Sequence, residues 1–305
     1  MNLRQARHED KDAIVAFTRE TWPERDGSDY VPDVFDRWVE TDGEHQRTTV
    51  AVDAGEPVGI LQTARLTDHE AWQQGMRVHP DYRGDGVAID LAHAGFDWAR
   101  EQGATVARNM VFSWNEAGLG LSRSAGYDPG PEFRWAHPDP DPGAVPDATV
   151  HDDPNAAWSF WHGSRSRDAL DGLGLHYEEP WTLAEVSRDV LEHARDEESL
   201  LVVDDDGTTA VTYRSRVSER DTENGTETWA EYGAAAWTDV DAAGDLLAAI
   251  ARDAAAVGAD RVRVLLPETT RTVSDVAANR VAVSDDPDFV FRADLTRPYR
   301  TGRHR

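Results

Sequence analysis

The sequence predicts an α+β protein with two similar domains, each a mixed β-sheet flanked by helices. Three observations lead to this prediction. Strand-like and helix-like segments follow one order in the first half, the order recurs in the second half, and a stretch rich in proline and aspartate separates the halves. The 305 residues are enough for two ordinary hydrophobic cores.

The first half has strand and helix patterns with recognisable ends. Asp10 precedes an amphipathic stretch, as a helix cap does, and the turn Asp53-Ala54-Gly55-Glu56 joins two β-type runs into a hairpin. In chain order we expect a strand at 3–7, a helix from 11, a helix at 32–39, hairpin strands at 48–52 and 58–64, a strand ending at 78, a long helix ending at Gly103, a strand at 105–112, a short helix from Asn115 and a closing strand.

A proline-rich stretch then divides the chain. It begins His137-Pro138-Asp139-Pro140-Asp141-Pro142-Gly143, which can sustain neither a helix nor a strand ladder. We therefore predict a first domain at 1–136, a linker at 137–148, a second domain at 149–297 and a basic tail at 298–305.

The same order of elements returns after the linker. We expect helices at 156–167 and 183–194, a hairpin at 200–217, a strand at 228–236, a helix at 239–257 and strands at 261–266 and 289–295. Gly103-Ala104 and Gly258-Ala259 each precede a strand, and Phe133-Arg134 and Phe291-Arg292 each stand in a closing strand. Together these echoes predict an internal duplication.

The composition limits the classes of function. The net charge is −27 and Lys11 is the only lysine, which indicates adaptation to high salt, as in a halophile. Nucleic-acid binding needs a basic face, so the charge argues against it. The chain has no cysteine, which excludes thiol catalysis and thiolate metal sites, and we expect no metal. Without a membrane span or signal peptide, we expect a cytoplasmic monomer or homodimer.

The most informative segment runs from Met76 to Ala88. Pro80 ends a strand, Gly84 and Gly86 allow tight backbone geometry, and a helix follows at once, so backbone N–H groups converge at a positive helix end. Arg83 adds a charge suited to phosphate oxygens. The segment lacks the third glycine of a dinucleotide fingerprint and the lysine of a Walker loop. It predicts a site for the pyrophosphate of an acyl-coenzyme A.

The pattern Val-x-Pro-x-x-Arg-x-x-Gly-x-Ala resembles motif A of the GNAT N-acetyltransferase superfamily, with Arg83, Gly86 and Ala88 at its R-x-x-G-x-G/A positions. The resemblance implies a GNAT fold, acetyl-CoA as the co-substrate, and coenzyme contacts along the strand end and the loop. The residues concerned are Met76, Arg77, Val78, Arg83, Gly84, Asp85, Gly86, Val87 and Ala88.

Residues 114–127 resemble the second signature of that family. Asn115 opens a short helix and joins the expected coenzyme contacts, while Gly118 replaces a usual alanine. Ser122 stands where the family often carries the tyrosine that protonates the departing thiolate. Because a serine hydroxyl is a poor proton donor, Ser122 either bridges a water to the sulfur or is a helix surface residue.

Acetyl transfer to an amine also requires a base, since an amine is mostly protonated near neutral pH. Many members of the family place a glutamate four residues before the valine of motif A, where this chain has Gln74. Glu70 shares the strand face of Gln74 by alternation and is the first substitute, with His69 and His79 also near. Each of these residues is either a base or structural.

The helix region around residues 28–38 resembles the acceptor side of two-domain members that include vertebrate histidine N-acetyltransferases. Asp29, Tyr30 and Arg37 either bind the charged groups of an amino acid or cap and support a helix. Two functions stay open. One is an N-acetyltransferase acting on the primary amine of a small molecule such as an amino acid. The other is a catalytically silent acyl-CoA-binding sensor or partner protein.

The second half has lost the informative loop. Its matching stretch, residues 236–244, has neither an arginine nor paired glycines. Asp239, Asp241 and Asp245 would repel a pyrophosphate and would themselves satisfy the positive helix end. We therefore predict that the second domain is a degenerate copy of the first.

Overall fold

The computed structural model describes residues 1–19, 21, 29–222 and 225–299, so the expected tail residues 300–305 lie outside the described range. The chain divides into two compact units. The first comprises Met1–Val111, Asn115–Pro129 and the residues from Val290 onward. The second comprises Phe112–Trp114 and Gly130–Phe289.

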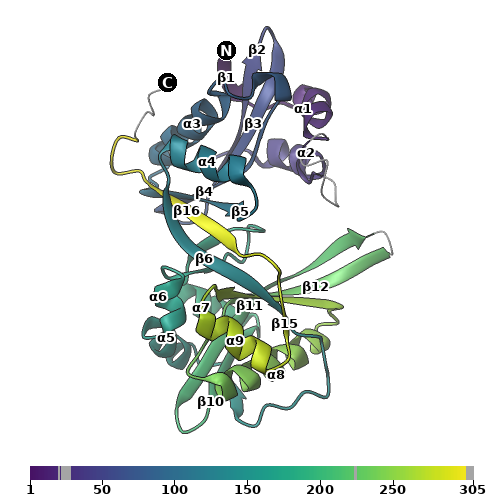
Figure 1. Ribbon diagram of the computed structural model, residues 1–305, viewed down its shortest axis with the longest axis vertical. Helices are drawn as coiled ribbons and strands as arrows, with labels where there is room; N and C mark the ends of the chain where they lie inside the picture. The colour runs from purple at the N-terminus through teal and green to yellow at the C-terminus, as the bar shows by residue number, and fades with distance from the viewer. Residues whose placement is uncertain (20, 22–28, 223–224, 300–305) are drawn as a thin grey trace. The chain divides into compact units, whose positions relative to one another are not determined.

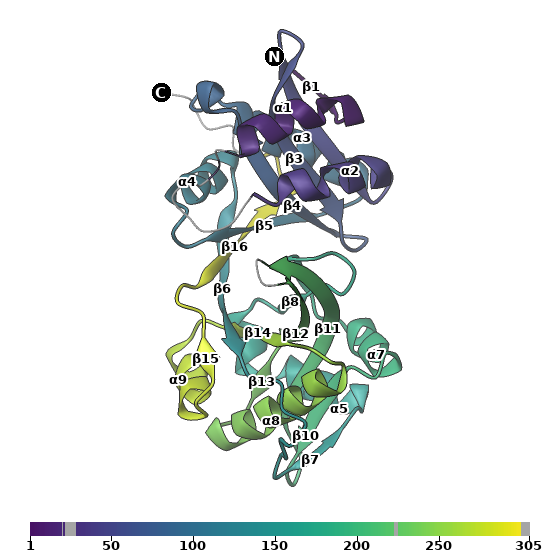
Figure 2. The same ribbon diagram turned by 90° about the vertical axis from the view of Figure 1, so that its right-hand side faces the viewer.

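The first unit is a mixed sheet with helices on both faces (Figures 1 and 2). Its strands lie in the order β1-β2-β3-β4-β5-β16, antiparallel from β1 to β4, with β4 parallel to β5. Its elements are β1 (Asn2–Gln5), η1 (His8–Asp10), α1 (Lys11–Thr18), α2 (Val31–Thr41), β2 (Gln46–Asp53), β3 (Glu56–Arg65), β4 (Glu70–Val78), η2 (Pro80–Tyr82), α3 (Val87–Glu101), β5 (Val106–Phe112), α4 (Glu116–Ala125) and, from Val290 on, β16 (Asp288–Asp294).

Alternation along β2 and β3 gives this sheet two apolar faces, because successive strand residues point to opposite sides. The face covered by α1 and α2 contains Ala6, Ile14, Phe17, Val31, Phe35, Trp38, Val50 and Ile60. The face covered by α3 contains Ala51, Val58, Leu61, Val87 and Leu91. The predicted mixed sheet flanked by helices is therefore confirmed, and the loop between β4 and α3 lies at one end of it.

The second unit has a similar mixed sheet in the order β6-β14-β12-β11-β10-β7, where β12 and β14 are parallel. A separate pair, β8 and β9, is antiparallel. Its elements are β6 (Asp128–His137), β7 (Thr149–His151), α5 (Pro154–His162), α6 (Arg165–Ala169), β8 (Leu173–Leu175), β9 (Leu183–Glu185), α7 (Arg188–Asp196), β10 (Leu200–Asp204), β11 (Thr208–Thr222), β12 (Gly225–Ala234), β13 (Ala236–Trp237), α8 (Val240–Ala256), β14 (Arg261–Pro267), α9 (Thr270–Ala278) and β15 (Ala282–Val283).

Helix α8 buries its apolar side against one face of the second sheet. The cluster includes Ala230, Tyr232, Val262 and Val264 from the strands, and Leu246, Ile250 and Ala254 from the helix. Within the described residues, no helix of either unit is both long enough and apolar enough to cross a membrane.

Two helices of the second unit differ from the sequence prediction. A single helix was expected at 183–194, but residues 183–185 form β9 and α7 begins only after Ser187, whose side chain accepts a hydrogen bond from the Val190 N–H. The helix expected at 156–167 is divided into α5 and α6, because Ser164 caps a new helix. Helix α9 was not predicted.

The compact units also divide the closing strands differently from the expected boundaries at 136 and 149. From Gly130 onward β6 belongs to the second unit, where Phe133–Ala136 pair with residues 264–267 of β14. From Val290 onward β16 belongs to the first unit, where it lies next to β5 in the strand order and the Leu295 N–H donates to the Thr105 carbonyl at 2.9 Å. Each sheet is thus completed by a strand from the other half of the sequence.

Candidate functional site

The loop between β4 and α3 presents several backbone N–H groups that no other described residue accepts. Gly84 and Gly86 have φ values of 92° and 86°, a left-handed conformation that glycine adopts without strain. Gly86 is the N-terminal cap of α3 and has no side chain to satisfy the first turn. The N–H groups of Gly84, Gly86, Val87 and Ala88 make no hydrogen bond to another described residue. The predicted glycine loop therefore has the geometry of an anion cradle.

The preceding residues hold this loop in place. Tyr82 donates a hydrogen bond from its hydroxyl to Asp53 at 3.2 Å, and this bond raises the pKa of the tyrosine. Arg83 is exposed and donates from Nε to the Val78 carbonyl at 3.3 Å, which keeps the guanidinium beside the strand end. Asp85 is also exposed, so its carboxylate does not occupy the interior of the loop.

A bulge at Gly75 redirects the end of β4. The register with β3 passes from Gln62 opposite Gln74 to Ile60 opposite Arg77, so β4 has one extra residue here. Gly75 has a φ of 68°, and a Cβ at this position would lie 2.4 Å from Cη2 of Trp38. The extra residue changes the alternation, and Met76 and Val78 pack beside the α3 core cluster.

The strand also separates from its parallel neighbour. β4 runs to Val78, but it pairs with β5 only from Glu70 to Trp72. Beyond Trp72 the edge of β4 that faces away from β3 has no ladder with β5 among the described residues. Backbone groups of Met76 and Val78 therefore lie at a strand edge near the glycine loop, as expected for contacts with an extended ligand.

Arg77 has a different environment from the one expected of a coenzyme contact. Its guanidinium donates from Nε and Nη2 to the Asp29 carboxylate at 2.5 and 3.1 Å, and from Nη1 to the Met76 carbonyl at 3.0 Å. Both side chains of the pair are buried. The same contact accounts for Asp29, a predicted acceptor-binding residue, which also accepts the Val31 N–H at the start of α2.

The other two acceptor candidates lie on α2 and just before it. Tyr30 is 43% exposed, and its ring lies 5.5 Å from Cζ of Arg77. Arg37 is exposed on α2, where its carbonyl accepts the Thr41 hydroxyl at 2.6 Å. Tyr30 therefore lies beside the Asp29–Arg77 pair, whereas the structure gives no contact that joins the Arg37 side chain to this group.

The two candidate bases on β4 are engaged by neighbours. Glu70 is buried and forms an ion pair with Arg108 of β5, and the Thr67 hydroxyl donates to it at 3.1 Å. Gln74 donates from its amide to the Gln62 side chain at 2.6 Å. The predicted common face of Glu70 and Gln74 agrees with the regular register between them. Glu70 lies at the far end of β4 from the glycine loop.

The second signature folds as a capped helix. Asn115 accepts the Gly118 N–H at 3.0 Å through its side chain, so it is the N-terminal cap of α4. A Cβ at Gly118 would lie 2.6 Å from Nδ2 of Asn115 and 2.9 Å from Cγ1 of Val111, which explains the glycine where alanine is usual. Ser122 is buried, not on the helix surface, and its hydroxyl accepts a hydrogen bond from Asn109 at 3.2 Å.

Sequence reasoning missed a buried polar chain behind the site. The Tyr127 hydroxyl donates to Gln73 at 2.8 Å, and the Gln73 amide donates to the Ala92 carbonyl of α3 at 2.9 Å. Burial raises the pKa of Tyr127 well above its ordinary value, so this tyrosine stays protonated. A Cβ at Gly95 would lie 2.3 Å from the Gln73 amide nitrogen. The sequence did contain a signal for this chain, because Gln73 is a polar residue within an otherwise largely buried strand.

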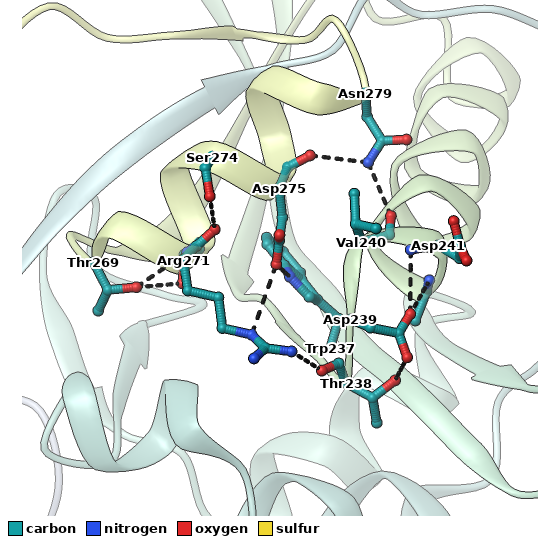
Figure 3. A network of polar contacts seen from close by, with 12 residues as sticks. Trp237, Thr238, Asp239, Val240, Asp241, Thr269, Arg271, Ser274, Asp275 and Asn279 are labelled. Atoms are coloured by element: carbon teal, nitrogen blue, oxygen red, sulfur yellow. Dashed lines mark hydrogen bonds and ion pairs between the residues drawn. The ribbon is translucent and has the colours of Figure 1, made fainter.

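The corresponding helix start in the second unit is already occupied (Figure 3). The Asp239 carboxylate accepts the N–H groups of Asp241 and Ala242 at 3.2 and 3.1 Å, and these bonds lower its pKa. Arg271 of α9 donates to the Thr238 carbonyl, and Asn279 donates to the Val240 carbonyl at 3.0 Å. This end of α8 therefore has no free cradle of the kind found in the first unit.

A second buried charge cluster was also not foreseen. In the second unit the Glu231 carboxylate contacts three guanidinium groups, with Arg263 at 2.9 Å and Arg216 at 3.1 Å, and with Arg220 closer still. Burial lowers the pKa of Arg263 to about 10. Nearby, Asp288 accepts the Trp135 indole N–H at 3.1 Å, and burial raises the pKa of Asp288 to about 6.

Comparison with known proteins gives a family match for the segment that contains the loop. Residues 11–127 match the model of the Acetyltransferase (GNAT) family. No curated protein matches the sequence.

Two solved structures share the fold of the chain over nearly its whole length. A protein described as an acetyltransferase from Thermoplasma acidophilum is 18% identical, with 96% of this chain and 100% of that chain covered and a TM-score of 0.59. A GCN5-related N-acetyltransferase from Sphaerobacter thermophilus is 16% identical, with 98% and 96% covered and a TM-score of 0.55. At these identities the likeness establishes the fold.

Proposed function

We propose that this protein transfers an acetyl group from acetyl-CoA to the primary amine of a small molecule such as an amino acid. The observation that carries the proposal is the set of backbone N–H groups at Gly84, Gly86, Val87 and Ala88, which no other described residue satisfies. Four such donors at the positive end of a helix suit a diphosphate. The GNAT-family match over residues 11–127 supports acetyl-CoA as its source.

The residues around the loop fit the coenzyme. A Cβ at Gly84 would meet nothing within 4 Å, so the space above the loop is open to a ligand. Arg83 would pair with phosphate oxygens from the solvent side, since a guanidinium stays charged at any relevant pH. Backbone groups of Met76 and Val78 at the unpaired edge of β4 would hold the extended arm of the coenzyme. Asn115 would act through its cap of α4, where its side chain oxygen is already bonded.

Acetyl-CoA supplies an activated acyl carbon. The amine nitrogen forms a bond to that carbon, the carbon–sulfur bond breaks, and the amine loses a proton while the sulfur gains one. This chain must align the amine and receive its proton. Gln74 cannot accept a proton, and Glu70 is paired with Arg108, so we propose that the proton leaves through water and that Glu70 is structural.

Ser122 is equally unsuited to give a proton to the departing thiolate. Its hydroxyl is buried beside Asn109, and an ordinary serine hydroxyl does not ionise near neutral pH. We propose that Ser122 positions Asn109 and that the thiolate takes its proton from solvent. Asp29 and Tyr30 lie at the start of α2 and form the proposed acceptor side together with Arg77. Arg37 contributes charge to the exposed face of α2.

We further propose that the second unit is a degenerate copy of the first domain. In the parallel strand pair of the first unit, Glu70 and Trp72 stand opposite Val106 and Arg108, while in the second unit Trp229 and Glu231 stand opposite Arg261 and Arg263. In each unit a glycine with positive φ and an alanine precede the second strand of the pair. The arginine pairs with a strand glutamate in both units, although glutamate and tryptophan have exchanged places.

The proposal is tested with purified protein, acetyl-CoA and a panel of amino acids and other small amines, in low and high salt. Release of free thiol with one or a few amines is the expected result. A specific observation favours the alternative sensor function: neither Gln74 nor Ser122 is an effective proton donor or acceptor. Saturable CoA binding by calorimetry without thiol release across the panel would establish that alternative. Failure to bind CoA would refute both functions.

A further inference from the structure

The ion pair between Arg77 and Asp29 joins the two parts of the proposed site. Arg77 follows the bulge of β4, and its Nη1 donates to the Met76 carbonyl at 3.0 Å, which fixes the orientation of the peptide after Met76. Its other donors grip both oxygens of Asp29. Asp29 in turn accepts the Val31 N–H at 2.9 Å, which fixes the start of α2. One salt bridge therefore ties the acceptor side of the site to the strand edge.

A second contact connects the same two elements. The ring of Trp38, on α2, lies where a Cβ at Gly75 would be, at 2.4 Å. Tyr30 packs edge-on against Trp38, with ring centroids 6.1 Å apart, and its ring also lies 5.5 Å from Cζ of Arg77. The N-terminal turn of α2 cannot shift without disturbing the bulge, because both contacts are close and the ion pair is bidentate.

The burial of the pair argues for geometry as its purpose. The side chains of Arg77 and Asp29 are 9% and 1% exposed. A buried ion pair gives little net stability compared with apolar residues of similar size, because both charges lose their hydration. It does impose one arrangement, because removal of either partner leaves a buried charge without its counter-ion. In this position the imposed arrangement is that of Met76 relative to Tyr30.

We propose that Arg77 and Asp29 are positioning residues that set the distance between the acceptor amine and the acetyl carbon, and this inference rests on the proposed function. Neither side chain touches the reacting atoms. They act through the Met76 peptide on one side and the start of α2 on the other. A displacement of about 1 Å between reacting groups costs on the order of a hundredfold in rate, so loss of the pair has a kinetic effect beyond its effect on stability.

The chain contains a matched control. Arg4 donates from two nitrogens to the two oxygens of Asp10, both at 2.7 Å, and Asp10 also accepts the Arg7 N–H at 2.8 Å beside the start of a helix. The Asp10 side chain is 3% exposed. This pair has the chemistry of Arg77–Asp29, but it involves β1 and the start of α1, so it does not touch β4.

The experiment compares Asp29→Asn with Asp10→Asn in the full chain. We expect both to lower the melting temperature, and only Asp29→Asn to lower kcat/KM for the acceptor by on the order of tenfold or more. The double variant Asp29→Asn/Arg77→Gln removes both buried charges. We expect it to recover the melting temperature and not kcat/KM. Recovery of both, or equal kinetic losses in the two single variants, overturns the proposal.

Hydrogen exchange separates this inference from the proposed function. In the protein without coenzyme, Asp29→Asn should speed amide exchange at residues 75–78 and in the first turn of α2 together, and Asp10→Asn should leave residues 75–78 unchanged. If exchange at 75–78 does not respond to Asp29→Asn, the pair does not position the strand edge. If the two variants give this exchange pattern but the wild-type protein releases no thiol with any amine, the acetyltransferase function is refuted and the coupling between α2 and β4 stands.

Discussion

Replacement of Asp288 by asparagine should remove a pH-dependent penalty on the stability of the second unit. Asp288 is 7% exposed and accepts the Trp135 indole N–H at 3.1 Å. Burial raises its pKa from 3.8 to about 6, because the ionised form loses hydration that one hydrogen bond and the field of Arg263 do not replace. Asparagine keeps an oxygen for the indole N–H and carries no charge.

The sign follows from the proton balance. Below pH 3.8 the carboxyl is protonated in both the folded and the unfolded chain and imposes no cost. Between pH 3.8 and about 6 the folded chain binds more protons, so the free energy of unfolding falls as the pH rises. Above pH 6 the carboxyl is ionised in both states, and the loss of stability no longer changes with pH. A difference of about two pH units between the folded and unfolded pKa corresponds to about 3 kcal/mol.

The assay is urea unfolding followed by tryptophan fluorescence between pH 4 and pH 8. We expect the free energy of unfolding of Asp288→Asn to rise relative to that of wild type by about 2–3 kcal/mol as the pH increases over this range. Most of this rise should occur below pH 7. The control is Asp285→Asn, which changes an exposed aspartate nearby and should run parallel to wild type. Parallel curves for Asp288→Asn and wild type would mean that the buried carboxyl carries no such penalty.

Two glycine substitutions test local structure against function. Gly118→Ala should destabilise the protein by about 1–3 kcal/mol, because its Cβ would force the Asn115 cap from α4. Gly120→Ala on the same helix meets nothing within 4 Å and should be neutral or stabilising. The two variants are compared by thermal unfolding, and equal melting temperatures would contradict the packing argument. Gly84→Ala should weaken CoA binding measured by calorimetry, because an alanine in the left-handed conformation of Gly84 strains the loop backbone by about 1 kcal/mol. Gly55, also left-handed with open space around it, is the control: Gly55→Ala should strain the backbone similarly and leave the CoA affinity unchanged. Equal CoA affinity in both would remove the loop from the site.

The sequence predicted those parts of the site that depend on local backbone chemistry. Pro80, Gly84, Gly86 and the apolar stripe of α3 form a strand, a turn and a helix start without help from distant residues, and the turn has the expected positive φ values. Asn115 was recognised by its position, and its actual role is the cap of α4. In both cases the physical requirement lies within a few residues along the chain.

The partners of polar side chains could not be predicted in this way. Arg77 was assigned to the coenzyme, yet its guanidinium binds Asp29, 48 residues away in sequence. Strand alternation placed Glu70 and Gln74 on one face, but it could not show that Arg108 neutralises the first. The bulge at Gly75 also reverses the faces of the residues that follow, because one inserted residue changes the period of two. Such pairings depend on the tertiary fold.

The closing strands show the same limit at a larger scale. Phe133-Arg134 and Phe291-Arg292 are the same residue pair, and this local pattern does not indicate which sheet each strand joins. Pairing decides between them: β6 pairs with β14 in the second unit, and β16 lies beside β5 in the first. The choice of sheet therefore depends on tertiary pairing, which the local pattern does not specify.

The starts of α3 and α8 differ in how the first N–H groups of the helix are satisfied. At α3, Gly86 offers no side chain and no described residue accepts the N–H groups of Val87 and Ala88, so an anion from outside can satisfy them. At α8, Asp239 supplies the carboxylate itself, and the same donors two and three residues beyond it are already bonded. An internal carboxylate has the advantage of being always present, so a diphosphate would have to displace it and would face its charge. The capping residue, glycine at α3 and aspartate at α8, therefore decides whether the N–H groups of the first helical turn are bonded within the chain.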